Sequence, residues 1–127
     1  MHELSIVMSV VDSVTESLMA RPELLAGGAR VKQVRLRVGV LSAVVEDSLQ
    51  FCYGIATEGT PLAGSTLVIN VLPVVGRCET CATDVEIESL QSFRCPRCHE
   101  PVGDLRQGRE LEIESIEIED PEEAVKK

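Results

Sequence analysis

The chain has 127 residues, 44% of them apolar, which fits one compact domain with a small appended element. Its 21 acidic and 12 basic residues give a formal net charge of −9, which argues against nucleic acid as a partner, because phosphate binding needs a dense basic face. No apolar run is long enough to cross a membrane, and acidic residues near the start argue against a signal peptide. We therefore expect a cytoplasmic protein with reduced cysteines.

The first part of the chain predicts helices and strands in alternation. Residues 4–20 have helical spacing of apolar residues, alternation over 34–38 predicts a strand, and the β-branched run 66–72 predicts a central strand. Between the strands, a second helix is expected with Ser42 as its N-cap. The predicted buried stripes are Leu4, Val7, Met8, Val11, Val14 and Leu18 in the first helix, and Val45, Leu49, Cys52, Tyr53 and Ala56 in the second.

The second part changes character at residues 77–100, which carry cysteines and few large apolar side chains. Such a segment depends on a bound metal to fold. Strand character returns at 111–118, and this strand is expected to rejoin the first two. The prediction is an α+β fold with a small mixed three-stranded sheet, two helices and an inserted zinc-ribbon-like loop. The predicted domains are 1–75 with 105–119 (the α+β domain), 76–104 (inserted zinc-binding domain) and 120–127 (flexible charged tail).

Two Cys-x-x-Cys pairs, Cys78 with Cys81 and Cys95 with Cys98, predict a metal site. Within each pair, a tight turn lets both sulfurs face one ion, and four thiolates suit tetrahedral Zn²⁺. In a reducing compartment, paired cysteines are better interpreted as metal ligands than as disulfide partners. A rubredoxin-like iron site uses the same ligands and stays open as an alternative.

Three further residues near the predicted elements are considered next to the metal site. His99 directly follows the last cysteine and is expected to be a solvated loop residue, with support of the metal ligands by hydrogen bonding, or direct ligation, as alternatives. Ala82 stands at the equivalent position after Cys81, where a left-handed turn would favour glycine. Cys52 is expected to be a small buried apolar residue on the second helix.

The chain start, Met1-His2-Glu3, is a chelating end. The amine of Met1 and the backbone nitrogen of His2 can close a five-membered ring, and the imidazole closes a six-membered ring. The backbone nitrogen of Glu3 offers a further donor. Such nitrogen donors favour Cu(II) or Ni(II) in a planar arrangement. From the residues alone, His2 is more often an incidental terminal residue, and the metal role is the alternative.

Motifs along nearly the whole chain together resemble one family. They are Met1-His2-Glu3-Leu4-Ser5, Val34-Arg35-Leu36-Arg37-Val38-Gly39 with Leu41-Ser42, Gly59-Thr60-Pro61-Leu62, the four cysteines with Pro96, and Gly108-Arg109-Glu110-Leu111 with Ile116. This set resembles the HypA/HybF nickel metallochaperones of hydrogenase maturation. Two departures stand out: many members carry Glu where Val40 stands, and Gly where His99 stands.

The resemblance implies a nickel metallochaperone rather than an enzyme. It implies Ni²⁺ as cargo on Met1, His2 and Glu3, and structural Zn²⁺ on the four cysteines. It also implies a nickel-handling GTPase as partner and the large subunit of [NiFe]-hydrogenase as recipient, with urease in some bacteria. The oligomeric state stays open, a homodimer included. The rival prediction is a zinc-ribbon adaptor that binds proteins and carries no nickel.

Overall fold

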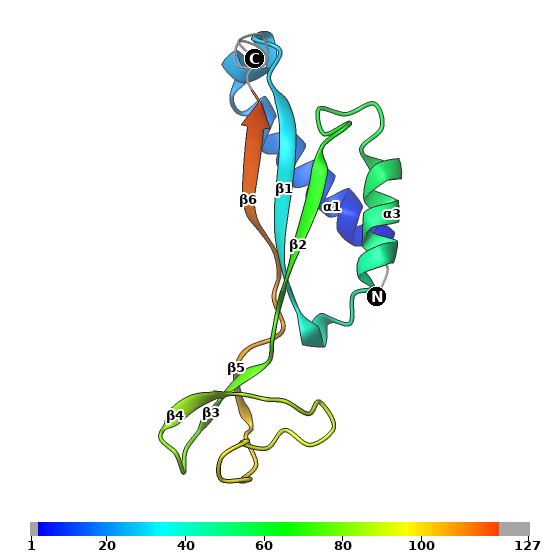
Figure 1. Cartoon of the computed structure of the whole chain (residues 1–127). Helices are drawn as coiled ribbons and strands as arrows, with labels where there is room; N and C mark the ends of the chain where they lie inside the picture. The colour runs from blue at the N-terminus through cyan, green and yellow to red at the C-terminus, as the bar shows by residue number, and fades with distance from the viewer. Residues whose placement is uncertain (1–2, 120–127) are drawn as a thin grey trace. The chain divides into compact units, whose positions relative to one another are not determined.

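The computed structural model describes residues 3–119, and the chain forms two compact units (Figure 1). Unit 1 contains Met1–Leu36, Val44–Ile69 and Ile113–Lys127, and unit 2 contains Arg37–Ala43 and Asn70–Glu112. This division into compact units does not test the predicted domain boundaries, which stay a prediction. Within residues 3–119, no helix combines the length and apolar character that crossing a membrane requires.

Helices dominate the first part of the chain and five strands follow α3, as in an α+β fold, and the strands build two three-stranded sheets of order β2-β1-β6 and β4-β3-β5. The fold prediction is thereby confirmed, including the return of the last strand to the first sheet. In Figure 1, β1 and β2 run in one direction and β6 in the other, so the first sheet is mixed. The helical elements are α1 (Glu3–Met19), α2 (Pro22–Ala26), the 3-10 turn η1 (Val40–Ser42) and α3 (Glu46–Ala56), and the strands are β1 (Arg30–Gly39), β2 (Thr66–Leu72), β3 (Val75–Cys78), β4 (Thr83–Glu86), β5 (Asp104–Gln107) and β6 (Leu111–Glu119).

Helices α1 and α3 of unit 1 pack against each other. The buried face of α1 differs from the predicted stripe at its start, because Leu4 and Met8 are 51% and 46% exposed while Val10 is buried. Both assignments fit helical spacing, so periodicity alone could not choose the centre of the face. The buried residues of the two helices are Val7, Val10, Val11, Val14 and Leu18 in α1 and Leu49 and Tyr53 in α3.

The start of α3 lies later than the sequence predicts, because Ser42 belongs to η1. Its hydroxyl donates to the carbonyl of Gly39 at 2.7 Å instead of capping the helix. Ala43 then adopts the left-handed conformation with φ 58°, which interrupts helical geometry. The N-cap of α3 is consequently Val45, which has extended dihedrals.

Tyr53 on α3 anchors this helix through a buried hydroxyl. Its Oη lies 2.6 Å from Oγ of Ser65, and Ser65 in turn donates to the carbonyl of Leu62. Burial raises the pKa of the phenol above its ordinary value of 10.0, and the hydrogen bond with Ser65 opposes this effect. The folded protein therefore holds the phenolic proton more tightly than the unfolded chain does.

Tyr53→Phe is expected to lower the free energy of unfolding by about 1 kcal/mol at pH 7, through loss of this hydrogen bond. In the wild type, the unfolded phenol ionises near pH 10 and the folded one at higher pH. Stability from this group is thus complete below about pH 10 and is lost as the pH rises through the folded pKa. Urea unfolding at pH 7 to 10.5 should show this extra decline only in the wild type. Tyrosinate absorbance can follow it directly, because Tyr53 is the single tyrosine; equal declines in both proteins would contradict the assignment.

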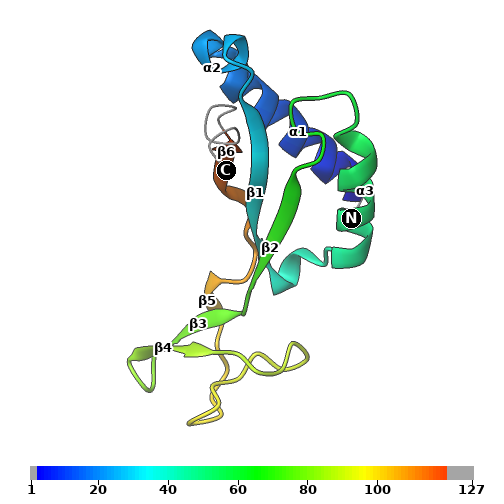
Figure 2. The ribbon, with the colours of Figure 1, turned by 45° about the horizontal axis from the view of Figure 1, so that its top comes forward.

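Unit 2 is built on an antiparallel hairpin of β3 and β4, with β5 on the other edge of β3 (Figure 2). Arg77 faces Asp84 across the hairpin, and their charged groups lie 3.9 Å apart. These three strands were not predicted, since the sequence suggested a metal-held loop in their place. Each has only four residues, too few for alternation to stand out.

Two glycines of unit 2 approach closely where β1 leads into η1. A side-chain carbon at Gly39 would overlap the backbone carbonyl of Gly108. Two hydrogen bonds hold this approach: the N–H of Gly39 donates to the carbonyl of Glu110 at 2.7 Å, and that of Leu41 donates to Gly108 at 2.8 Å. The absence of a side chain at Gly39 is therefore a packing requirement, since its φ of −74° is open to any residue.

Candidate metal centre

The structure brings the four predicted cysteines of unit 2 into one cluster. Their sulfur atoms all lie within 4.8 Å of one another. Sγ of Cys78 is 3.6 Å from Sγ of Cys98, and Sγ of Cys81 is 3.8 Å from Sγ of Cys95. These distances exceed a disulfide bond of about 2.05 Å by far. All four thiols are free.

The sulfur spacing fits a tetrahedral metal ion. With Zn–S bonds of about 2.3 Å, a regular tetrahedron has sulfur–sulfur edges of about 3.8 Å. The two distances of 3.6 and 3.8 Å match this value. Four soft thiolates also form the donor set that selects zinc or iron. The cysteine cluster is therefore chemically and geometrically able to hold such an ion.

Each cysteine pair lies on a tight hairpin turn. Cys78 ends β3 and Cys81 follows in the turn before β4. The second pair lies in a turn closed by the Arg94–Pro101 bridge, in which the N–H of His99 donates to the carbonyl of Cys95 at 2.9 Å. The residues after the second cysteine of each pair, Ala82 and His99, have φ of 54° and 64°. The left-handed turn foreseen at these positions is thus present without glycine.

Backbone N–H groups point at the sulfur atom of Cys95 and favour its ionised form. The N–H of Cys98, and after it that of Arg97 at 3.4 Å, lowers the pKa of Cys95 to about 7. In contrast, the pKa of Cys81 is raised to about 12. The largest cause is its hydrogen bond with the thiol of Cys98, and the second is burial. Four thiolates this close repel one another, so a bound cation is needed to ionise them all.

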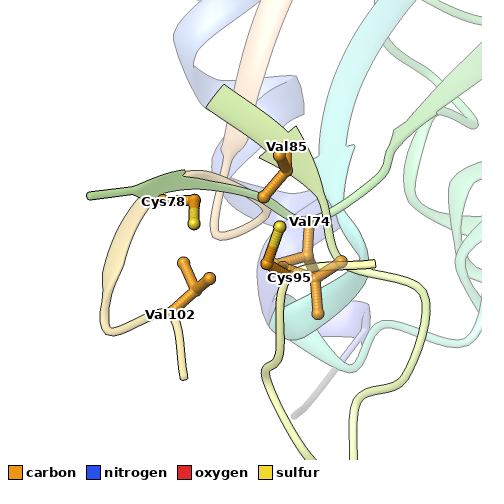
Figure 3. Packing of buried hydrophobic residues seen from close by; sticks show 6 residues of the cluster. Val74, Cys78, Val85, Cys95 and Val102 are labelled. Atoms are coloured by element: carbon orange, nitrogen blue, oxygen red, sulfur yellow. The ribbon is translucent and has the colours of Figure 1, made fainter. Parts of the chain in front are cut away.

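Aliphatic side chains surround the cluster on its inner side. Figure 3 shows Cys78 and Cys95 among Val74, Val85 and Val102. Both cysteines are almost fully buried, at 1% and 0% exposure. Ile87 completes the buried group, and the half-buried side chains packed on it are Leu41, Cys81, Phe93, Cys98 and Leu105. The four cysteines thus form the polar centre of the apolar core of unit 2.

His99 stands beside the cluster but does not join it. His99 is exposed, and among the described residues the group able to hold a metal ion consists of the four cysteines alone. Its carbonyl accepts a hydrogen bond from the guanidinium of Arg94 at 3.0 Å. The expectation of a loop histidine agrees with this position, and a supporting role toward the ligands stays a prediction.

Of the predicted nickel ligands, Met1 and His2 lie outside the described residues. Glu3 is the first residue of α1. Its carboxylate accepts a hydrogen bond from the N–H of Val45 at 3.3 Å. This contact was not predicted, because the two residues are 42 positions apart and no periodicity links them.

Two other residues singled out by sequence are not members of the described cysteine cluster. Val40 begins η1, is 38% exposed and offers no carboxylate where many relatives were expected to have one. Cys52 on α3 is half-buried rather than fully buried. The prediction that Cys52 is buried therefore holds only in part.

Comparison with known proteins identifies the family. The sequence matches the family described as “Hydrogenase/urease nickel incorporation, metallochaperone, hypA” over residues 1–118. The chain belongs to the HypA family. This match confirms the resemblance drawn from the motifs and places the protein among nickel-incorporation factors.

Individual relatives agree with this assignment. The hydrogenase maturation factor HypA of Chloroflexus aurantiacus is 44% identical over 117 residues, covering 92% of this chain and 98% of that protein. The protein of the same name from Chlorobaculum parvum is 44% identical over 119 residues, covering 94% and 100%. The solution structure of the Ni metallochaperone HypA from Helicobacter pylori superposes with a TM-score of 0.56 at 23% identity, covering 92% and 97%. The last comparison supports the fold alone.

Proposed function

We propose that this protein binds Ni²⁺ at its amino terminus and delivers it, in the cytoplasm, during maturation of [NiFe]-hydrogenase. The observation that carries the proposal is the family match over residues 1–118, since it includes the chelating start Met1-His2-Glu3. Urease is the alternative recipient, because the family description names both enzymes.

The proposed nickel ligands are the Met1 amine, the His2 imidazole and backbone nitrogen, and the Glu3 backbone nitrogen. Glu3 begins α1. The first N–H groups of a helix have no acceptor within the helix, so the Glu3 nitrogen is not committed to the backbone ladder. We expect this site of nitrogen donors to be exposed, which suits a cargo ion that must leave again.

The proposed role of the cysteine cluster is structural, with Zn²⁺ on Cys78, Cys81, Cys95 and Cys98. Four protein ligands leave a tetrahedral ion without an open position, so the ion would stabilise the fold and take no substrate. The observed sulfur distances of 3.6 and 3.8 Å support this role. Cargo and structural metal would thus use donors of different chemical character.

We further propose that transfer involves no covalent chemistry. The partners would be a nickel-handling GTPase and the large subunit of the hydrogenase. The net charge of −9 favours partner surfaces with basic residues.

Nickel titration of the zinc-loaded chain tests the proposal. The wild type should bind nickel, and His2→Ala should bind it about 10- to 100-fold more weakly, since even residues that only support metal ligands contribute that much. A chain extended at its amino terminus should also lose the site, because the extension moves the amine away. Zinc content, measured by elemental analysis after mild chelation, should stay the same in all three proteins.

The opposite result would favour the zinc adaptor. If His2→Ala and the extended chain take up nickel like the wild type, the terminus is not the site. The protein would then bind partners through its surface without carrying nickel there.

A further inference from the structure

The side chain of Glu3 connects the start of α1 with the start of α3 in unit 1. Its Oε2 accepts a hydrogen bond from the N–H of Val45 at an N···O distance of 3.3 Å. Val45 is the N-cap of α3, and valine has no polar atom with which to cap a helix. The contact therefore gives the N–H group of this N-cap residue a hydrogen-bond acceptor that lies outside α3.

The contact reproduces half of a capping box with a residue from another helix. In a capping box, Glu or Gln three residues after the N-cap accepts from the N-cap N–H. Ser48 stands at that position of α3 and cannot reach back in the same way. Glu3 supplies the missing carboxylate, and the positive end of the α3 dipole favours its charge.

We infer that the Glu3 side chain positions the nickel-binding terminus, while the Glu3 backbone nitrogen serves as ligand. The inference rests on the proposed nickel site. Met1 and His2 precede Glu3 by two and one peptide bonds, and consecutive Cα atoms are about 3.8 Å apart. Fixing Glu3 to Val45 restricts the space open to the terminal amine and the imidazole, so less ordering remains for nickel to impose.

Two variants separate positioning by the carboxylate from ligation by it. Glu3→Ala removes the acceptor, and the zinc-loaded full chain should then bind nickel about 3- to 10-fold more weakly, the loss expected for one ordinary hydrogen bond. Glu3→Gln has an amide oxygen at the same distance from the backbone and should stay within about twofold of the wild type. Calorimetric nickel titration measures all three affinities.

Amide hydrogen exchange gives a readout that is independent of nickel. Without nickel, the Val45 N–H should exchange faster in Glu3→Ala than in the wild type, and Glu3→Gln should restore its protection. Glu46→Gln is the matched charge control, because Glu46 is an exposed acid next to Val45 in the first turn of α3. It should change neither the Val45 exchange nor the nickel affinity by more than about twofold.

Each contrary outcome has a separate meaning. If Glu3→Gln loses nickel binding as fully as His2→Ala, the carboxylate is a ligand and the positioning role is wrong. If both Glu3 variants bind like the wild type while His2→Ala does not, positioning is wrong and the proposed function stands. If His2→Ala also binds like the wild type, the nickel site itself is wrong.

Discussion

Cys95→Ser is expected to abolish zinc retention and to unfold unit 2. Cys95 is fully buried in the apolar group around the cluster. Structural zinc sites contribute apparent binding free energies of about 10–16 kcal/mol. Burial of the aliphatic residues of that group stabilises unit 2 by about 1.5–3 kcal/mol for each side chain; these residues are Val74, Val85, Ile87 and Val102. Ordering the segment costs conformational entropy. Without the metal, burial of these four side chains is not enough to offset that cost.

The measurement combines zinc content with amide hydrogen exchange. In Cys95→Ser, protection should be lost across β3, β4 and β5. Cys52→Ser is the matched control, because Cys52 lies on α3 outside the cluster, and it should keep its zinc. A Cys95→Ser protein with a full zinc complement and protected β3 amides would show that the cluster is not a structural metal site.

Gly39→Ala is expected to lower the free energy of unfolding by more than about 4 kcal/mol, the range reserved for severe packing defects. The added carbon would overlap the backbone carbonyl of Gly108. Backbone atoms cannot turn aside as a side chain can, so the two adjoining hydrogen bonds would have to break. The φ of −74° at Gly39 suits alanine, so the effect would report the contact and not backbone strain.

Urea unfolding of the zinc-saturated chain, followed by far-ultraviolet circular dichroism, checks this expectation. Gly54→Ala is the control: a side-chain carbon at Gly54, inside α3, meets nothing within 4 Å. That substitution should raise stability by about 1 kcal/mol through helix propensity. Equal stability of Gly39→Ala and the wild type would mean that the close approach to Gly108 is absent in solution.

Sequence patterns predicted the longer strands, either from alternating polarity or from a continuous β-branched run. The run 66–72 is β2, the alternation over 34–38 falls within β1, and strand character after 111 is β6. The patterns did not reveal β3, β4 and β5, which have only four residues each. Strands this short contain too few residues for an alternation of apolar and polar side chains to be recognised.

The candidate sites were predictable to different depths. Cysteine spacing alone brought together Cys78, Cys81, Cys95 and Cys98, since each pair is a local turn. The contact of Glu3 with Val45 depends on where α3 begins, and the sequence placed that start at Ser42. The approach of Gly39 to Gly108 joins segments far apart in the chain, which one sequence cannot indicate.

The seven residues from Arg37 to Ala43 belong to unit 2 although they precede α3 in the chain. Leu41 among them packs on the cysteine-bearing core. A protein engineer who transplants only the cysteine-bearing stretch into another scaffold would leave Leu41 behind and open a gap in that core. Unit 2 therefore cannot be transferred to another protein as one continuous segment, and a working chimaera would need both of its segments.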